Sequence, residues 1–163
     1  DTSMKRTTIN GVVEELVEFI KYELEENQVK LETKLDKNLP KIDLDEKYMK
    51  QALINIIKNG VAAMDEGGTL TIITREDQGY VHVDISDSGI GMSEEQLSKI
   101  FEPYYTTKEF GSGLGLTVVY KVVREHNGEV TVHSREDQGT TFTISIPIPD
   151  SEKRLLDWKG EEK

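Results

Sequence analysis

The stretch from Asp87 to Leu116 constrains the fold of this 163-residue chain more than any other segment. It reads DSGIGMSEEQLSKIFEPYYTTKEFGSGLGL and holds two glycine clusters, one at 89 and 91 and one at 111, 113 and 115. Glycine has no Cβ, so its backbone N–H groups can come close to a ligand and a positive φ costs little. Free N–H groups that lead into the start of a helix suit a polyphosphate. The stretch is therefore predicted to close over a phosphate-bearing ligand.

The spacing of these glycines differs from two common phosphate-binding motifs. Residues 111–115 read GxGxG instead of the GxGxxG of a dinucleotide-binding turn, and they follow a loop instead of a strand. The chain also lacks the GxxxxGKS or GxxxxGKT sequence of a P-loop. Either cluster taken alone remains compatible with an ordinary glycine-rich loop.

Length, charge and the absence of cysteine limit the class of protein. A 163-residue chain with 36% hydrophobic residues can form one globular domain that buries about two thirds of its unfolded surface. The net charge of −11 argues against nucleic acid or an anionic membrane as the main partner. The lack of cysteine means no disulfides or thiol chemistry, which suits a cytoplasmic protein. We find no signal peptide and no apolar run long enough to span a bilayer, so a membrane anchor of a parent protein is expected outside this fragment.

Hydrophobic periodicity predicts one domain over residues 1–149, followed by a charged tail over 150–163 that is either a short docked helix or a frayed end. The predicted strands are 5–9, 29–35, 69–75, 80–87, 129–134 and 140–148. The predicted helices are 10–26 with Asn10 as cap, 46–64 after an Asp45 cap, a short one after Ser93, and 116–126. Because the strands alternate, one face of the sheet meets solvent and the helices cover the other. The prediction is an α+β fold: a two-layer α/β sandwich whose mixed, mostly antiparallel sheet is covered on one face by helices.

The helix predicted over 46–64 carries a second unusual feature. Asn55 and Asn59 lie one turn apart, on the same side of the helix and away from the centre of its apolar stripe. Asparagine is a poor helix former, so two of them inside one helix call for a functional reason. The alternative is a pair of solvated side chains on an exposed face.

Five motifs follow one another in a fixed order: NIIKNGVAAM (55–64), DSGIG (87–91), FEPYYTTK (101–108), GSGLGL (111–116) and GTTF (139–142). Together they resemble the ATP-binding catalytic domain of bacterial sensor histidine kinases, within the superfamily that includes gyrase B, Hsp90 and MutL. The resemblance extends over residues 7–149, and FEPYYTTK most resembles the nitrogen-sensing and sporulation kinases. It implies a Bergerat-type ATP-binding fold with ATP and Mg²⁺ as cofactors. Gly60 stands where the family usually has alanine, and Tyr104 replaces the more usual phenylalanine.

The resemblance also implies a role for each matching residue. Asp87 would accept a hydrogen bond from the exocyclic amine of adenine, because an ionised carboxylate only accepts and the amine only donates. Asn59 would bind Mg²⁺ through its amide oxygen, assisted by Asn55, since a neutral oxygen suits a hard cation whose other ligands are phosphates and waters. Thr107 and Lys108 would lie near the γ-phosphate, with Asn55 and Lys108 as catalytic residues. The remaining nucleotide contacts would come from Lys58, Gly89, Gly91, Tyr104, Gly111, Gly113, Leu114, Gly115, Leu116 and Thr140.

Several of these residues also have a plainer interpretation. Asp87 is compatible with an ordinary turn aspartate at a strand end, and Lys58 with a solvated helix lysine. Phe101 and Tyr104 resemble an aromatic anchor for a mobile lid, but core packing would explain them as well. The order of the motifs favours the ligand-binding interpretation of Asp87.

The residue at position 55 separates a kinase from an ATP hydrolase within this resemblance. The hydrolases have a glutamate there as general base for water, whereas Asn55 cannot accept a proton. A histidine kinase instead passes the γ-phosphoryl group to a histidine on a dimerisation domain. His82, His126 and His133 are interpreted as surface or strand histidines, so the acceptor is expected outside this fragment, with a response regulator downstream. Two alternatives stay open: a superfamily ATPase that acts as a conformational switch, and a nucleotide-binding interaction module without transfer activity.

Overall fold

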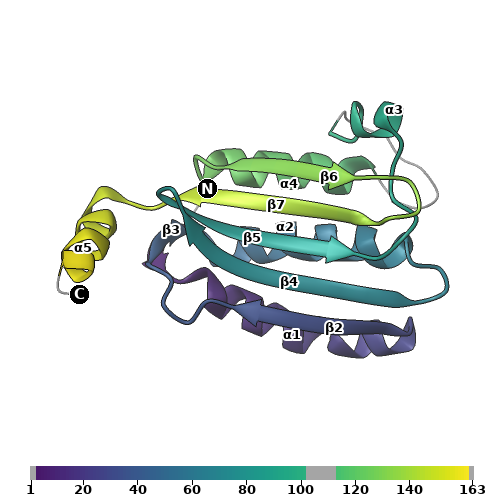
Figure 1. The fold of residues 1–163 in the computed structure, drawn as a ribbon, viewed down its shortest axis with the longest axis horizontal. Coiled ribbons are helices and arrows are strands. Elements are labelled where there is room, and N and C mark those ends of the chain that lie inside the picture. The colour runs from purple at the N-terminus through teal and green to yellow at the C-terminus, as the bar shows by residue number, and fades with distance from the viewer. Residues whose placement is uncertain (1–2, 102–112, 162–163) are drawn as a thin grey trace.

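A five-stranded sheet forms the centre of the computed structural model, which describes residues 3–101 and 113–161. The strand order is β2 (Val29–Leu35), β4 (Gly68–Asp77), β5 (Tyr80–Asp87), β7 (Thr140–Pro147) and β6 (Glu129–Ser134) (Figure 1). β2 pairs with β4 in parallel, and the other neighbouring pairs of this sheet are antiparallel. The predicted mixed, mostly antiparallel sheet is confirmed.

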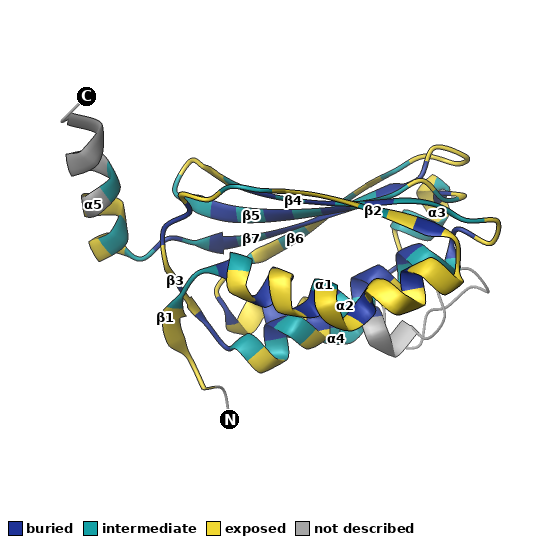
Figure 2. Ribbon diagram, turned by 90° about the horizontal axis from the view of Figure 1, so that it is seen from below, coloured by how far each residue is buried: buried dark blue, intermediate teal, exposed yellow. Residues whose placement is uncertain are grey.

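Three helices cover one face of this sheet: α1 (Ile9–Glu26), α2 (Glu46–Ala62) and α4 (Gly113–Glu125) (Figure 2). In β5 the buried residues Val81, Val83 and Ile85 alternate with half-buried polar ones, so one side of the strand packs against the helices. Figure 2 shows buried residues on the helix surfaces that point toward the sheet and exposed residues on the outer surfaces. The core lies between these two layers, which confirms the predicted sandwich.

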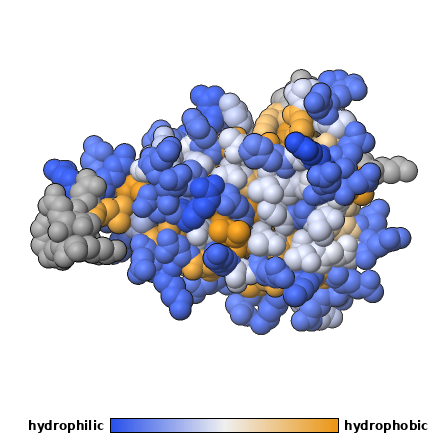
Figure 3. All heavy atoms as spheres, in the orientation of Figure 1, coloured by the Kyte–Doolittle hydropathy of each residue, from blue (hydrophilic) through white to orange (hydrophobic). Residues whose placement is uncertain are grey.

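The other face of the sheet is open to solvent and mostly hydrophilic (Figure 3). Its centre holds Arg75, Asp84 and Thr143 from three neighbouring strands. The Arg75 Nε lies 2.8 Å from Asp84 Oδ2, and the Thr143 hydroxyl donates to Asp84 Oδ1 at 2.6 Å. Polar side chains on the uncovered face thus bond one another, as expected for a sheet with one wet side.

The ends of several predicted elements shift in the structure. The strand expected over 5–9 is the shorter β1 (Lys5–Thr7), and it pairs with β3 (Ile42–Leu44), which the sequence did not predict. α4 begins three residues before the expected Leu116. Strands of three residues carry almost no periodicity, and a glycine-rich helix start reads as a loop, so the pattern could not place these boundaries.

Asn10 does not cap α1, which corrects the prediction. The helix begins one residue before it, and the residue at the cap position, Thr8, makes no side-chain cap bond. The Asn10 amide group instead donates to the carbonyl oxygen of Asp36 at 2.7 Å and accepts from the Thr74 hydroxyl at 2.8 Å. Asn10 therefore connects α1 to the region beyond β2 and to β4.

The predicted caps of α2 and of the short helix α3 (Glu94–Leu97) are confirmed. The Asp45 carboxylate accepts from the Tyr48 N–H at 3.2 Å. Ser93 and Gln96 form a capping box, in which each side chain accepts from the backbone N–H of the other residue. These local signals need only neighbouring residues, so the sequence was sufficient to find them.

The tail over 150–163 forms a helix, α5 (Asp150–Glu161), within its described part. The helix projects from the end of the molecule that is farthest from α3 (Figure 1). Arg6 donates to the Ser151 hydroxyl at 3.0 Å, and Leu156 is partly buried against the core. None of the helices in the described ranges, α5 included, is long and apolar enough to cross a membrane.

Candidate functional site

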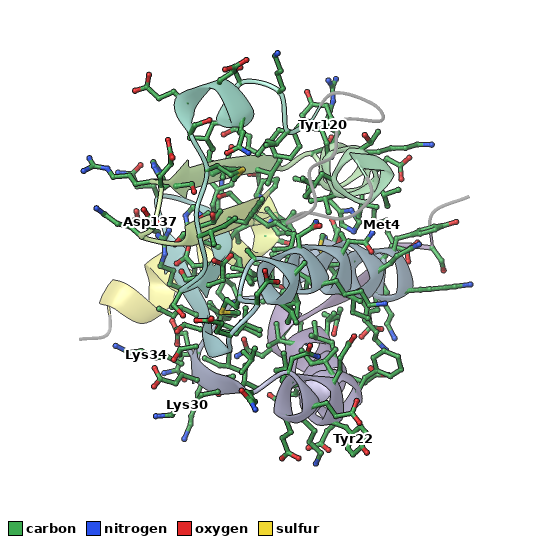
Figure 4. The ribbon with its side chains drawn as sticks, turned by 90° about the vertical axis from the view of Figure 1, so that its right-hand side faces the viewer. Met4, Tyr22, Lys30, Lys34, Tyr120 and Asp137 are labelled. Carbon is green, nitrogen blue, oxygen red and sulfur yellow. The ribbon has the colours of Figure 1, made fainter. Side chains whose placement is uncertain are left out.

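The end of α2, the end of β5 and the start of α4 meet at one end of the molecule, on the right of Figure 1. α2 and α4 are antiparallel, because the Asp45 N–H at the start of α2 donates to Nε2 of His126, just after α4, at 3.0 Å. Figure 4 looks onto this end of the molecule, with Asp137 of the β6–β7 loop and Tyr120 of α4 on opposite sides of it. The predicted site residues Asn59, Asp87 and Thr140 lie together at this end.

A small pocket of about 10 Å³ lies between α2 and the sheet at this end. It brings together three predicted site residues from three elements: Asn59 of α2, Asp87 of β5 and Thr140 of β7. The sequence did not assign its other lining residues to the site: Ile56, Gly60, Leu70, Ile85 and Phe142. Their sequence signal was an inward position on a helix or a strand, which any core residue shares.

Asp87 is the acidic group of this pocket. The Gly89 N–H donates to its Oδ1 at 2.9 Å, and the backbone N–H of Thr140 bonds to the same carboxyl group. Burial disfavours the charged form and raises the pKa of Asp87 to about 6, although the two N–H groups favour ionisation. Near neutral pH the pocket therefore presents an ionised, acceptor-only group among apolar walls.

Gly89 and Gly91 bring the DSGIG loop against the backbone of neighbouring elements. A Cβ on Gly89 would overlap the carbonyl oxygen of Ala63, to which the next residue in the loop donates at 3.1 Å. Gly91 has a φ of 69°, and a Cβ there would overlap the carbonyl oxygen of Arg135. The two glycines thus fit the loop between α2 and the β6–β7 loop. Their contacts with a ligand stay a prediction.

The three polar residues singled out on α2 differ in exposure. Asn55 and Asn59 are half-buried, Asn59 lines the pocket, and Lys58 is exposed. Within the described ranges, no group of three or more His, Asp and Glu side chains could hold a metal ion. A divalent cation beside Asn59 could take the amide oxygen of this residue as one ligand, with phosphate and water oxygens as the others. This donor set suits Mg²⁺.

Part of the predicted site cannot be compared with the structure. Four of the predicted site residues lie outside the described ranges: Tyr104, Thr107, Lys108 and Gly111. The residues that form the first turn of α4 are Gly113, Leu114 and Gly115. The side chain of Leu116 is buried in the core, so a ligand could meet this residue only through its backbone.

Phe101 packs on α4 at the edge of this region. Its ring centroid lies 5.8 Å from that of Tyr120, and the Arg124 guanidinium lies 5.6 Å from the Tyr120 ring centroid. Phe101 is also partly buried against the core. The core-packing interpretation of this aromatic residue therefore holds in the structure.

His126 corrects one prediction, because it is a buried residue and not a surface or strand histidine. Its Nε2 accepts from the Asp45 N–H, so Nδ1 carries the proton and donates to the Val122 carbonyl oxygen at 2.8 Å. The neutral ring thus joins the end of α4 to the start of α2. Its partner Asp45 lies 81 residues away along the chain, so no local pattern could reveal this contact.

Comparison with known proteins identifies the family of this chain. Residues 44–150 match the family described as histidine kinase-, DNA gyrase B- and HSP90-like ATPase. The chain belongs to this family. Sporulation kinase E of Bacillus subtilis is 36% identical over 151 residues, which cover 91% of this chain. The chain spans 20% of the length of that kinase.

Solved structures of histidine kinases show that this ATPase-family chain has the fold of their catalytic domains. The nucleotide-free catalytic domain of the histidine kinase ThkA has a TM-score of 0.81 and 29% identity, covering 91% of this chain and 100% of the other. ThkA has also been solved in complex with the response regulator TrrA, with a TM-score of 0.78, 26% identity, and 91% and 43% coverage. This member of the histidine kinase-, gyrase B- and HSP90-like family is the catalytic, ATP-binding domain of a sensor histidine kinase.

Proposed function

We propose that this domain binds ATP with Mg²⁺ in the pocket between α2 and β5, and donates the γ-phosphoryl group to a histidine on a separate dimerisation domain. The observation that carries the proposal is the ionised Asp87 carboxylate in a pocket whose other walls are mainly apolar, with Asn59 beside it. Family membership supports ATP as the ligand. The Mg²⁺ ion, the residue roles and the acceptor are the further parts of the proposal.

Asp87 recognises the adenine base. Ile56, Ile85 and Phe142 offer apolar contact to a flat ring, while the carboxylate is oriented by the N–H groups of Gly89 and Thr140. The exocyclic amine of adenine donates to this carboxylate. Guanine would place a carbonyl oxygen at the same point, and two acceptors facing each other are unfavourable. The pocket therefore favours adenine over guanine.

Asn59 holds Mg²⁺ through its amide oxygen, with Asn55 one turn earlier on the same side of α2. Lys58 and the segment that contains Thr107 and Lys108 approach the phosphates, where positive charge offsets the negative charge of the transferred group. The glycines at 111, 113 and 115 bring backbone N–H groups to the polyphosphate, and the N-terminus of α4 adds a favourable dipole.

The acceptor histidine belongs to another domain. During transfer the bond from the γ-phosphorus to the β–γ bridging oxygen breaks, a bond to an imidazole nitrogen forms, and ADP leaves. His126 is buried, while His82 and His133 lie on strands of the sheet. Asn55 cannot take a proton from water, which disfavours hydrolysis. Transfer then depends on positioning and charge neutralisation, which an ATP-holding domain can supply to a separate acceptor.

A response regulator is the proposed downstream partner, and the cytoplasm is the proposed location. The complex of ThkA with TrrA supports such a partner. Residues 1–149 form the proposed ATP-binding unit, because the pocket, the sheet and the three covering helices all lie within them. Residues 150–163 form a tail outside that unit.

Calorimetry and transfer of labelled phosphate test this function on the same samples. Native chain should bind a non-hydrolysable ATP analogue with Mg²⁺, and with a sensor-kinase dimerisation domain it should move label from ATP to a histidine there. Asp87→Ala should weaken binding at least tenfold, because it removes a hydrogen bond to a charged group. Asn59→Ala should lose most of the Mg²⁺-dependent affinity. Gln51→Ala, an exposed change one turn before Asn55, is the matched control on α2.

Each contrary result points to a different alternative. Equal binding by the native chain and Asp87→Ala would place the base elsewhere. Binding without any label on the acceptor would favour an interaction module. Steady phosphate release that Asn59→Ala abolishes would favour a conformational ATPase.

A further inference from the structure

Gly60 of α2 lies against Asp87. A Cβ at this position would lie 3.3 Å from both Cβ and Oδ2 of Asp87, and 3.6 Å from Cδ1 of Leu70. Glycine inside a helix is less stable than alanine. The φ of Gly60 lies outside the positive range that would require glycine, whereas the φ of Gly91 lies within it. The backbone of α2 therefore does not demand glycine at position 60, and the contact with Asp87 is what distinguishes the site.

The missing Cβ leaves space beside the carboxylate. The pocket of about 10 Å³ is lined by Gly60 and Asp87, and by apolar side chains that include Ile56, Leu70 and Phe142. A space of this size is about one water-sized sphere. An alanine methyl group would project into it and toward the same carboxylate oxygen. Position 60 therefore controls how much room remains next to Asp87.

We infer that Gly60 is a specificity-determining residue, which lets this domain accept an adenine nucleotide with one methyl group on its exocyclic amine. The inference rests on the proposed function, in which that amine donates to Asp87. A mono-methylated amine keeps one N–H group for the carboxylate, and the space that Gly60 leaves holds the methyl group among apolar neighbours. A dimethylated amine has no N–H group, so it leaves the buried acceptor without its partner.

Two glycine-to-alanine variants, compared with the native chain, separate this effect from general changes in stability. Calorimetry with Mg²⁺ compares ADP, N6-methyl-ADP and N6,N6-dimethyl-ADP on the native chain, on Gly60→Ala and on Gly11→Ala. Gly11 is the matched control, because it lies in α1 and a Cβ there would meet nothing within 4 Å. The measured quantity is the ratio of the dissociation constants for N6-methyl-ADP and ADP on each protein.

The native chain and Gly11→Ala should give a ratio below about three. Gly60→Ala should raise the ratio at least tenfold, the usual effect of one carbon that a pocket cannot hold. The dimethylated nucleotide should bind at least tenfold more weakly than ADP to all three proteins.

Two outcomes would overturn the inference, and they are distinguishable. Binding of ADP with the same ratio in Gly60→Ala and native chain would contradict the role of Gly60 alone. No binding of ADP to the native chain would contradict the proposed function, and this inference with it.

Discussion

At the scale of single residues, Asp87 combines a loss of stability with the binding role proposed for it. Its pKa of about 6 lies above the ordinary aspartate value, because burial disfavours the carboxylate more than the N–H groups of Gly89 and Thr140 favour it. The folded protein thus holds a proton on Asp87 more tightly than the unfolded chain does. At pH 7.5 the ionised group lowers the free energy of unfolding. As the pH falls through 6 toward 4, the folded protein takes up a proton on Asp87 and the free energy of unfolding rises again.

Asp87→Asn should therefore stabilise the protein while it weakens nucleotide binding. At pH 7.5 we expect the free energy of unfolding to rise by on the order of 1 kcal/mol, a value reduced for the partial exposure of the group. The gain should disappear at pH 4.5, where the native carboxyl group is largely protonated. Urea unfolding at both pH values measures the difference in the free energy of unfolding between the variant and the native chain. Asp65→Asn, at an exposed position, is the control. A variant that is less stable than the native chain at pH 7.5 would contradict the assigned cost of burial.

Residues with local or motif-borne signals were predictable at this scale, and residues with distant partners were not. The cap of Asp45 and the capping box at Ser93 depend on residues within three positions, and the structure contains both. Asn10 and His126 bond to residues 26 and 81 positions away. The sequence alone predicts Asn10 as a helix cap and His126 as a surface or strand histidine, because only the fold brings their partners to them.

At the scale of elements, α2 has hydrogen bonds to other segments at its start and residues of the pocket near its end. At its start, Asp45 accepts from the Ser3 N–H at 2.7 Å and from the Tyr48 N–H at 3.2 Å. Burial alone would raise the pKa of Asp45, but the hydrogen bonds from these backbone N–H groups outweigh it and hold the pKa below its ordinary value. Near its other end the same helix presents Asn59 and Gly60 to the pocket.

Replacing Asp45 should loosen the start of α2 in a pH-dependent way. Asp45→Ala should lower the free energy of unfolding by about 1–2 kcal/mol, the usual effect of losing an N-cap. Asp45→Asn should lower the free energy of unfolding by less than Asp45→Ala at pH 7, because the amide oxygen of asparagine can still accept from the Tyr48 N–H. Since the native pKa is depressed, its stabilising effect is present above about pH 4 and is lost as the pH falls further. The difference in the free energy of unfolding between the native chain and Asp45→Asn, measured by urea unfolding, should therefore disappear between pH 5 and pH 3.

The exposed Asp43→Ala provides the comparison for this prediction. Asp43 lies in β3 and pairs with Arg6 at 2.7 Å on the surface, where an ion pair contributes little. Its removal should change the free energy of unfolding much less than Asp45→Ala does, because solvent screens the pair. A loss as large as that of Asp45→Ala would mean that the cap has no special role.

Element prediction succeeded where periodicity was long and failed where it was short. Each strand of the five-stranded sheet has at least six residues and was predicted within one or two residues of its observed ends. β3 has three residues, and the start of α4 lies in a glycine-rich run. In both places there are too few alternating apolar and polar side chains to reveal the hydrophobic periodicity of a strand or a helix.

At the scale of the whole molecule, the ATP-binding fold depends on residues that precede the family match. The match covers residues 44–150, but α1 and β2 lie before it. β2 forms the edge of the sheet beside β4, and its Lys30 and Lys34 point outward into solvent (Figure 4). Charged edge strands discourage pairing with other chains. The first 43 residues thus protect one edge and part of the covered face.

Removal of residues 1–43 should abolish cooperative folding and cause aggregation. α1 buries six apolar side chains, namely Ile9, Val12, Val13, Leu16, Ile20 and Leu24. Their burial contributes about 9–18 kcal/mol, comparable to the net stability of a whole domain. Light scattering after gel filtration, together with urea unfolding, would compare the truncated and native chains. A truncated chain that stays monomeric and unfolds in one sharp transition would contradict this dependence.

The layered architecture was predictable from the sequence, but the strand order was not. Alternating strands and amphipathic helices require one covered and one open face, and the structure has both (Figures 1 and 2). The parallel pairing of β2 with β4, and the separate ribbon of β1 and β3, depend on which edges meet after folding. No single segment carries that information.

The position of the chain ends has a mechanical consequence. Both described ends lie away from the pocket, and the N-terminal end enters the fold through β1 (Figures 1 and 2). Three residue pairs join β1 to β3, whereas eight join β5, which carries Asp87, to β7, which carries Thr140. Tension applied through the N-terminal end thus meets the weaker of the two connections first. The ribbon of β1 and β3 should therefore open under a smaller load than the pairing of β5 with β7, which holds Asp87 and Thr140 side by side.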